Sequence, residues 1–311
     1  MEFIKFLLFF TEIFFIIYLM CYALILASSV IVGAISTYEK LKKNRLKNII
    51  EVDEDVKISI IVPAYNEEVT IMDTIESLIH LEYKAYEIIV VNDGSKDNTL
   101  NKVIESCNLN IADKFVLNKL NTKKIKNIYE GKYKGISITL VDKENGGKAD
   151  SLNAGIDVAT FPWFISIDAD SMLQTDALKK VVTPVLEDDT VIASGGAIMV
   201  ANGVTLKNGK VIKYDIPKNL FAALQTVEYN RTFLASRILF DKVNANLIIS
   251  GAFGLFRKDM VIAAGGYEPS TRGEDMELVV KLHSFCKLNK IKYKIKYAED
   301  AICWTQVPER M

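Results

Sequence analysis

Cysteine and histidine are scarce in this sequence, and their scarcity argues against two kinds of site. The 311 residues include only two histidines, His80 and His283. The four cysteines are scattered and form no Cys-x-x-Cys pair: Cys21, Cys107, Cys286 and Cys303. This spacing argues against a zinc site and against a disulfide framework, and it fits a reducing compartment.

An excess of charge of either sign is also missing. Lys and Arg together number 38, Asp and Glu number 39, and the formal net charge is −1. Proteins that bind nucleic acids usually carry a basic excess. The charge balance therefore gives no indication of a nucleic-acid partner.

Apolar residues, by contrast, are abundant, and the longest apolar run lies near the N-terminus. Ile13 to Ile35 is a run of 23 residues without a charge, long enough to cross a bilayer core of about 30 Å as a helix. Lys5 is the only basic residue before the run, whereas five basic residues follow it closely: Lys40, Lys42, Lys43, Arg45 and Lys47. This asymmetry predicts a membrane anchor whose following chain lies in the cytoplasm. A cleaved signal peptide is the alternative, but the run is too long and the charge bias has the wrong sign.

We therefore predict a single-pass protein of the cell membrane with a cytoplasmic domain. Residues 1–36 form the transmembrane anchor, residues 37–56 form a polar juxtamembrane linker, and residues 57–311 form the domain.

The start of the domain predicts a parallel sheet. Lys57–Pro63 reads as a strand, Asn66 as a helix cap, and Tyr86–Val91 as a second buried strand. A strand, a helix and a strand with short connections form a βαβ unit, which places ligands at the carboxyl ends of the strands. The fold class is therefore α/β.

The rest of the domain continues this alternation. Residues 109–135 are polar and read as a surface excursion. Further strands are predicted at 136–141 and 191–200, and helices at 97–108, 148–159, 176–187, 218–242 and 274–288.

The stretch around which the chain is organised runs from Phe161 to Ser171, an apolar strand that ends in Asp168 and Asp170. Residues i and i+2 of a strand point the same way, so both carboxylates are expected to face one spot. They would repel each other unless a cation lies near them. A hard divalent ion, Mg²⁺ or Mn²⁺, suits this position; an ordinary strand followed by an Asp-rich turn is the alternative.

Other strand ends carry acids and glycines as well. Asp93 follows one strand and Asp142 ends another, and these ends meet at one edge of a parallel sheet. Asp93 has the alternative of a simple turn residue. Gly146 and Gly147 allow the backbone to approach a ligand closely, and Lys148 is a cation suited to phosphate; an ordinary loop with a solvated lysine is the alternative.

Five motifs in order resemble the family 2 inverting glycosyltransferases, specifically the membrane branch with cellulose, hyaluronan and bacterial poly-N-acetylglucosamine synthases. The motifs are Pro63-Ala64-Tyr65-Asn66-Glu67-Glu68, Val91-Asn92-Asp93-Gly94-Ser95, the segment 144–155, Asp168-Ala169-Asp170 and the segment 271–278. The resemblance covers residues 57–308 and implies a nucleotide-sugar-binding sandwich of the GT-A type.

The resemblance also implies roles for single residues. The donor, a UDP-sugar, would be bound by Pro63, Ala64, Tyr65, Glu67, Asp93, Lys148 and Asp168. Asp170 would hold the metal. Asp275 would be the general base that takes the proton of the acceptor hydroxyl, with Glu274 as the second choice. Two adjacent acids near a helix start are alternatively favoured there by the helix dipole.

The acceptor side resembles the family less specifically. Gly251, Phe253, Glu274 and Trp304 lie in segments that shape the acceptor side in relatives. Trp304 either stacks on a sugar ring or is a buried packing residue. The helix predicted at 218–242 resembles interfacial helices that lie against the membrane, and a plain core helix is the alternative.

In one respect the sequence departs from the family. Relatives continue into a Gln-x-x-Arg-Trp motif and further membrane helices, whereas this sequence reaches Met311 without either. We expect that the chain is C-terminally truncated or that the missing part is a separate C-terminal partner polypeptide.

The predicted function is metal-dependent transfer, with inversion, of an N-acetylglucosamine-like sugar from a UDP-sugar to a growing cell-surface polysaccharide. One alternative is transfer of a single sugar to a lipid-linked acceptor, a polyprenyl phosphate. The other is a non-catalytic sugar-nucleotide-binding subunit.

Overall fold

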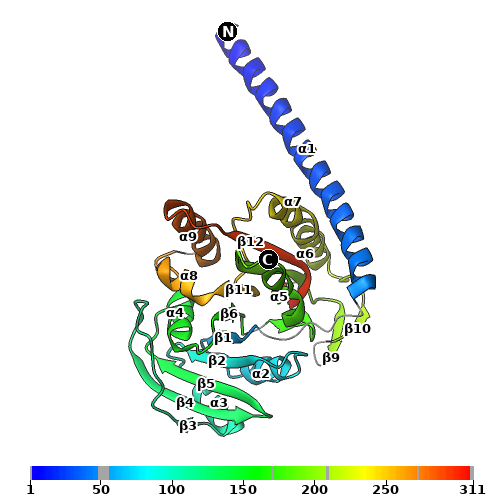
Figure 1. Cartoon of the computed structure of the whole chain (residues 1–311). Coiled ribbons are helices and arrows are strands. Elements are labelled where there is room, and N and C mark those ends of the chain that lie inside the picture. Colours follow the sequence, from blue (N-terminus) through cyan, green and yellow to red (C-terminus); the bar gives the residue numbers. More distant parts are fainter. Residues whose placement is uncertain (1, 48–55, 170, 208–209, 272, 309–311) are drawn as a thin grey trace.

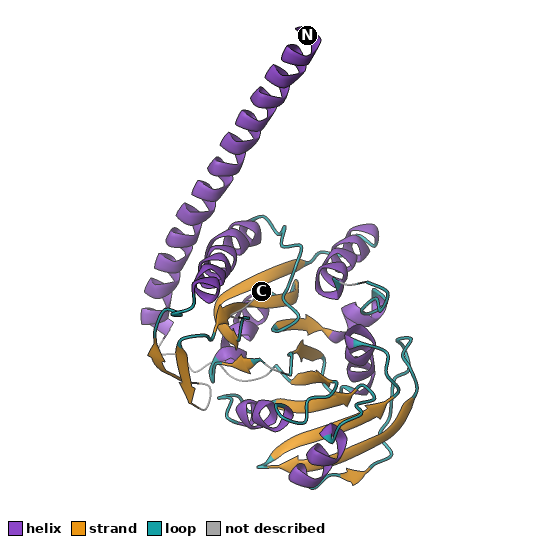
Figure 2. Ribbon diagram, turned by 180° about the vertical axis from the view of Figure 1, so that it is seen from behind, coloured by secondary structure: helices purple, strands orange, loops and turns teal. Residues whose placement is uncertain are grey.

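A long helix projects from an α/β domain in the computed structural model of the chain (Figure 1). The structure describes residues 2–47, 56–169, 171–207, 210–271 and 273–308. The predicted α/β fold is confirmed, because one large sheet lies between two layers of helices (Figure 2).

The centre of the sheet is parallel, as the βαβ pattern predicts. Its strands, in spatial order, are β5 (Ile136–Lys143), β2 (Tyr86–Asn92), β1 (Ile58–Ala64) and β6 (Trp163–Ser166). Each neighbouring pair runs parallel. Apart from the partly buried Ile136, the β-branched residues of these strands are buried on both faces, which is typical of parallel sheets covered by helices.

Strands on both sides extend this centre to ten strands in the described part of the chain. On one side β4 (Ile125–Tyr133) pairs antiparallel with β5, and β3 (Asn110–Ile111) pairs with β4. On the other side β11 (Gly254–Arg257) lies antiparallel between β6 and β8 (Val191–Val200). Beyond β8 come β12 (Lys294–Thr305) and β7 (Met172–Leu173), and β9 (Val204–Lys207) and β10 (Lys210–Tyr214) form a separate hairpin.

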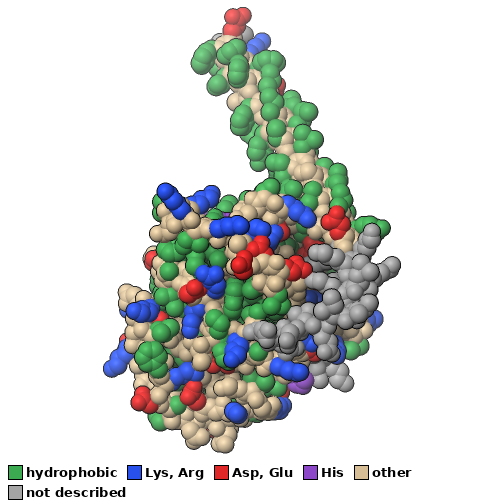
Figure 3. Space-filling model, viewed as in Figure 1, with side chains coloured by type: hydrophobic (Ala, Val, Ile, Leu, Met, Phe, Trp, Pro, Cys, Tyr) green, Lys and Arg blue, Asp and Glu red, His purple; other side chains and the backbone are tan. Residues whose placement is uncertain are grey.

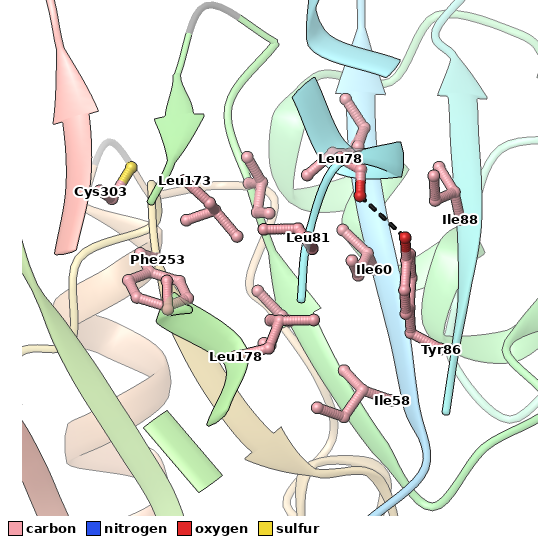
Figure 4. Packing of buried hydrophobic residues seen from close by; sticks show 14 of the residues in the cluster. Ile58, Ile60, Leu78, Leu81, Tyr86, Ile88, Leu173, Leu178, Phe253 and Cys303 are labelled. Atoms are coloured by element: carbon pink, nitrogen blue, oxygen red, sulfur yellow. Dashed lines mark hydrogen bonds between the residues drawn. The ribbon is translucent and has the colours of Figure 1, made fainter. Parts of the chain in front are cut away.

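Two hydrophobic clusters fill the spaces between sheet and helices. One face packs against α2 (Ile71–Ile79), α3 (Thr99–Cys107) and α5 (Ala177–Glu187). The other packs against α4 (Lys148–Val158), α8 (Lys258–Ala263) and α9 (Glu274–Leu288). Figure 4 shows the first cluster, in which the Tyr86 hydroxyl donates to the Leu78 carbonyl at 2.9 Å.

The predicted N-terminal apolar helix is present as α1 (Glu2–Lys47). By length and composition, Glu2–Glu39 is a candidate membrane span. Its apolar side chains are largely exposed and cover the projecting part of the molecule (Figure 3). The helix continues past the predicted boundary at residue 36, so the part of the predicted linker up to Lys47 is helical; residues 48–55 lie outside the described residues.

The lower part of α1 packs against a second long helix. This helix consists of α6 (Leu220–Arg231), a π-helical turn η1 (Thr232–Ser236) and α7 (Arg237–Lys242), which agrees with the helix predicted at 218–242. Ser29 and Gly33 of α1 are buried there, and a side chain at Gly33 would overlap the Leu234 carbonyl. Small residues thus bring the two backbones close together.

Several local predictions are wrong. Asn66 does not cap α2, because it adopts a left-handed φ of 57° and its side chain accepts from the Lys96 amide. The cap position is Thr70, four residues later, and the helix begins at Ile71. Residues 109–135 are not only a surface excursion, since they contain β3 and β4. Strand β12 was not predicted, because its lysines and acids interrupt the apolar pattern.

Candidate functional site

A cavity of about 530 Å³ opens at the carboxyl edge of the central strands. Its lining consists of Pro63, Ala64, Tyr65, Glu67, Asp93, Asn145, Gly147, Lys148, Ser151, Asp168 and Ala169. All seven residues that the sequence predicts to bind the donor are in this list. The fold therefore brings together four segments that lie up to a hundred residues apart, although the role of each residue stays a prediction.

One acidic side chain that lines the cavity holds a glycine turn in place. Asp93 follows β2 and is 4% exposed. Its carboxylate accepts from the Gly146 amide at 2.9 Å and from the Gly147 amide at 2.8 Å. Gly147 has a φ of 88°, which favours glycine, and it directly precedes α4. Asp93 thus holds the turn that presents the N-terminus of α4 to the cavity.

Lys143 forms a buried ion pair with Asp93, and sequence reasoning missed this residue. Its side chain is fully buried at the end of β5, and its ammonium lies 2.5 Å from Asp93 and 2.6 Å from Asp150. A buried lysine is tolerated only with such partners. The only sequence signal was a lysine at the end of a buried strand, directly before a glycine turn.

A second lysine, Lys148, lines the cavity. The Lys148 ammonium lies 2.5 Å from Asp168 and 3.6 Å from Glu274. Burial by itself favours the neutral amine, but the carboxylates of Asp168, Asp275 and Glu274 outweigh it, so the pKa of Lys148 is raised. The lysine is therefore charged and suited to contact a phosphate oxygen.

Asp275, the predicted base, lies next to this cation in the first turn of α9. Its Oδ2 accepts from the Gly251 amide at 2.7 Å. Its Oδ1 is buried and has no hydrogen-bond partner among the described residues. Burial raises the pKa of Asp275; Lys148 and the Gly251 amide oppose this shift, while Glu274 and Asp168 add to it. A carboxylate with one fixed and one free oxygen can accept a proton from a ligand.

The acidic pair at 168 and 170 is described only in part. Asp170 lies outside the described residues. Strand β6 ends at Ser166, so the strand alternation that predicted a common direction for the two acids does not reach Asp168. Asp142, the third acid at a strand end, does not line the cavity; its carboxylate accepts from the Asn92 side-chain Nδ2 at 2.9 Å.

The predicted acceptor-side residues divide into two groups. Gly251 and Glu274 lie beside Asp275 and Lys148. Phe253 is fully buried and packs over Gly196, where a side chain would overlap its ring. Trp304 is 5% exposed and lies against Tyr214, with 6.4 Å between ring centroids, so the geometry favours the packing alternative.

Comparisons with known proteins agree with this arrangement. Residues 59–263 match the family model described as Glycosyl transferase family 2. The chain is 29% identical over 296 residues to the poly-beta-1,6-N-acetyl-D-glucosamine synthase of Staphylococcus epidermidis, covering 94% of this chain and 61% of that protein. It is 30% identical over 265 residues to the synthase of Staphylococcus aureus strain COL, covering 84% of this chain and 53% of that protein. The chain thus spans little more than half the length of these curated relatives.

Solved structures share the fold. A mannosyltransferase from Pyrobaculum calidifontis, PcManGT in complex with GDP-Man and Mn²⁺, superposes with a TM-score of 0.58 at 20% identity, covering 92% of this chain and 70% of that one. Residues 1–349 of S. aureus TarS in complex with UDP-GlcNAc superpose with a TM-score of 0.52 at 16% identity, covering 82% and 60%. At these identities the likeness concerns the GT-A-like α/β fold.

Proposed function

Because the chain belongs to glycosyl transferase family 2, we propose that it is a membrane-anchored inverting glycosyltransferase. It moves an N-acetylglucosamine-like sugar from a UDP-sugar to a hydroxyl of a growing cell-surface polysaccharide. One observation carries this proposal: the seven predicted donor residues line a single cavity, whose Lys148 interacts electrostatically with the half-buried Asp275.

The choice of donor is supported by the relatives and by the cavity. Two relatives are named as synthases of poly-beta-1,6-N-acetyl-D-glucosamine, and TarS was solved with UDP-GlcNAc. In this chain the N-terminus of α4 and Lys148 provide a positive end for a diphosphate. Tyr65 and Pro63 offer apolar surface on the same wall for the uracil ring.

The reaction needs one base and a good leaving group. Asp275 Oδ1 takes the proton of the acceptor hydroxyl, and the hydroxyl oxygen forms a bond to the anomeric carbon of the donor sugar. The bond from that carbon to the diphosphate oxygen breaks, and UDP leaves with the electron pair. Attack from the face opposite the leaving group inverts the anomeric configuration. Positioning of the hydroxyl by Asp275 is expected to contribute a factor of about 10² to 10⁴.

We also propose a divalent metal, Mg²⁺ or Mn²⁺, with Asp170 as its ligand. The described donors at the site are compatible, because Asp168 offers a carboxylate that is one third exposed and has Lys148 as its partner. No group of three or more metal-binding side chains occurs among the described residues. Such a group is not required, because Mg²⁺ at nucleotide sites is commonly held by one or two carboxylates together with phosphate oxygens. When bound, the ion would neutralise charge on the diphosphate. Asp170→Ala should abolish Mn²⁺-dependent UDP binding in calorimetric titration; an unchanged titration would argue against this role.

The membrane location is supported by two exposed apolar surfaces. Helix α1 has the length and composition of a membrane span, and basic residues follow its apolar part. Leu220, Leu224 and Val227 recur at helical spacing on α6 and are exposed. We propose that α1 crosses the membrane once, that α6 lies at its surface and that the α/β domain faces the cytoplasm.

Product analysis tests the proposed function. The purified chain in lipid nanodiscs would be incubated with UDP-GlcNAc and Mn²⁺, alone and with a candidate C-terminal partner polypeptide. A ladder of oligosaccharides is expected. A single sugar on a polyprenyl phosphate would favour the lipid-linked acceptor, and UDP-GlcNAc binding without any transfer in either mixture would favour a non-catalytic subunit.

A further inference from the structure

A second cavity, with a volume of about 910 Å³, opens at the edge of the sheet opposite the donor cavity. Trp163, the first residue of β6, lines it and is level with the first residue of β1. Arg257, the last residue of β11, also lines it and pairs with Trp163 across the two strands. The second cavity therefore lies at the amino ends of β1 and β6, and among the described residues it shares no lining with the donor cavity.

A smaller hollow of about 340 Å³ adjoins the second cavity. Leu117, Thr160 and Lys258 line both of them. These residues come from the segment before β4, from the connection between α4 and β6, and from α8, which covers the same face of the sheet as α4 (Figure 1). Thr160, Pro162 and Asp259 are exposed, so the second cavity is open to solvent. Pockets for small molecules commonly have volumes of about 300 to 1,000 Å³, so the space suits one such ligand.

Lys258, at the junction of the two hollows, has no carboxylate partner. Its ammonium donates to the Ala159 carbonyl at 2.7 Å, and no carboxylate lies within ion-pair distance in the part of the chain that the structure describes. Burial lowers the pKa of Lys258, and the charges of Glu87 and Asp157 oppose this shift. An ammonium has three N–H donors, so two remain for a ligand. A partly buried cation with one neutral acceptor is stabilised by an anion.

The acids nearest to this lysine are committed to bonds inside the protein. Glu87 is 5% exposed, and its carboxylate accepts from the amide of Thr160 at 2.8 Å and from its hydroxyl at 3.2 Å. Asp157 is 2% exposed and accepts from the amides of Lys119 and Leu120. Neither carboxylate is therefore available to neutralise the cations that line the second cavity.

Two further cations line the second cavity. Lys119 is exposed, and no acid lies within ion-pair distance of its ammonium among the described residues. Arg257 donates through Nε to Asp259 at 2.8 Å, and its two terminal nitrogens have no partner among the described residues. Asp259 is the single acid among the described lining residues, against three cations. This excess favours an anionic ligand, although the whole chain has a net charge of −1.

Much of the remaining lining is apolar or aromatic. Leu117, Pro162, Trp163 and Ile262 belong to this part. Directly paired residues of antiparallel strands project from the same face of a sheet, so the Trp163 ring and the Arg257 guanidinium share one face. A bare inorganic anion would use only the cations. A ligand that carries both phosphates and a flat ring would also cover the indole.

We propose that the second cavity binds a nucleoside polyphosphate at a site separate from the donor cavity. Its phosphates contact Lys258, Arg257 and Lys119, which donate charge-assisted hydrogen bonds. Its base stacks on the indole of Trp163. The proposed function uses none of these four residues, and this site does not depend on that function.

Lys258→Gln tests the proposal through binding. ATP and GTP would be titrated by calorimetry against the full chain in phosphatidylcholine nanodiscs, with saturating UDP and Mg²⁺ so that the donor cavity is occupied. At least one of the two nucleotides should bind. Its affinity should fall at least tenfold in Lys258→Gln, because a charge-assisted hydrogen bond is lost, while the affinity for UDP changes less than twofold. Lys132→Gln, a change at an exposed lysine that lines neither hollow, should alter neither affinity.

Lys119→Gln keeps the test independent of folding. The Lys119 side chain is exposed and unpaired, so the melting temperature should stay unchanged. Nucleotide binding should weaken by a factor of about 2 to 5, as for one ion pair near the surface.

Trp163→Leu tests the ring separately from the phosphates. Nucleotide binding should fall about tenfold, because base stacking on the indole is lost. Binding of inorganic triphosphate should change less than twofold, which would show that the cationic part of the site is intact although Trp163 also packs against the first hydrophobic cluster.

Three results would overturn the proposal. They are an unaltered chain that binds neither ATP nor GTP, unchanged nucleotide binding in both Lys258→Gln and Lys119→Gln, and inorganic triphosphate that binds the unaltered chain as tightly as the nucleotide. Failure of the unaltered chain to bind UDP-GlcNAc would instead count against the proposed function and not against this site.

Discussion

The ammonium of Lys143 lies 2.5 Å from the carboxylate of Asp93, and both side chains are buried. The family resemblance assigns Asp93 to the uracil of the donor, but most of its hydrogen-bonding capacity is used inside the protein. It binds Lys143 and the amides of Gly146 and Gly147. Asp93 therefore has a structural task, which is to fix the glycine turn before α4, whatever contact it makes with the donor.

Lys143→Met should destabilise the domain and weaken donor binding. It would leave Asp93 and Asp150 as buried carboxylates without their shared cation. Breaking a buried ion pair costs about 3 to 5 kcal/mol, which chemical denaturation can measure. In the control Lys134→Met, the lost pair with Glu76 is at the surface and little change is expected. Equal stability of the two variants would contradict the structural role of Lys143.

Gly251→Ala should impair transfer by displacing the base. A Cβ at Gly251 would overlap the Asp275 carboxylate, which the Gly251 amide now holds. We expect transfer to fall at least tenfold, because small displacements of a catalytic group have large effects. Gly273→Ala is the matched control two residues before Asp275, since a Cβ there meets nothing within 4 Å. Similar rates for both variants would show that the close approach at Gly251 has no catalytic importance.

The pH dependence of transfer should report on Asp275. Burial raises its pKa above the ordinary value of 3.8. A general base acts when ionised, so the rate rises with pH as Asp275 loses its proton, and this acidic limb lies above that of an ordinary aspartate. Lys148 lowers the Asp275 pKa, so Lys148→Gln should move the limb to higher pH.

The measurement is the pH profile of kcat at saturating donor. Lys132→Gln, a change at an exposed lysine on β4 away from the cavity, should leave the profile unchanged. An acidic limb that does not move in Lys148→Gln would mean that the group titrating in the profile is not Asp275.

Sequence reasoning succeeded where a single local pattern decides the structure. The strand at Val191–Val200 and the helix at Glu274–Leu288 have the predicted bounds. A run rich in apolar and small residues determines the first, and the acidic first turn together with helical periodicity determines the second. The predicted donor residues line one cavity because the motifs that contain them follow the ends of successive strands.

It failed where distant segments decide the structure. Strand β4 lies near the edge of the sheet and β12 pairs with β8, and neither has a continuous apolar pattern. A lysine such as Lys143 is usually exposed, and only the meeting of Asp93 and Asp150 makes its burial possible.

The central claim is that Asp275 removes the proton of the acceptor hydroxyl. Asp275→Asn keeps the shape of the side chain and its bond to Gly251 but removes the basic oxygen. Transfer should fall by a factor of about 10² to 10⁴. The affinity for UDP-GlcNAc should stay nearly unchanged, because Asp275 does not line the donor cavity.

The decisive measurement is sugar transfer from UDP-GlcNAc by the Asp275→Asn variant, made together with calorimetric titration of the donor. Asp259→Asn, an exposed aspartate on α8, serves as the control and should transfer at the unaltered rate. Lost transfer with retained donor affinity is the predicted result. Turnover close to that of the unaltered chain would contradict the assignment of Asp275 as the base.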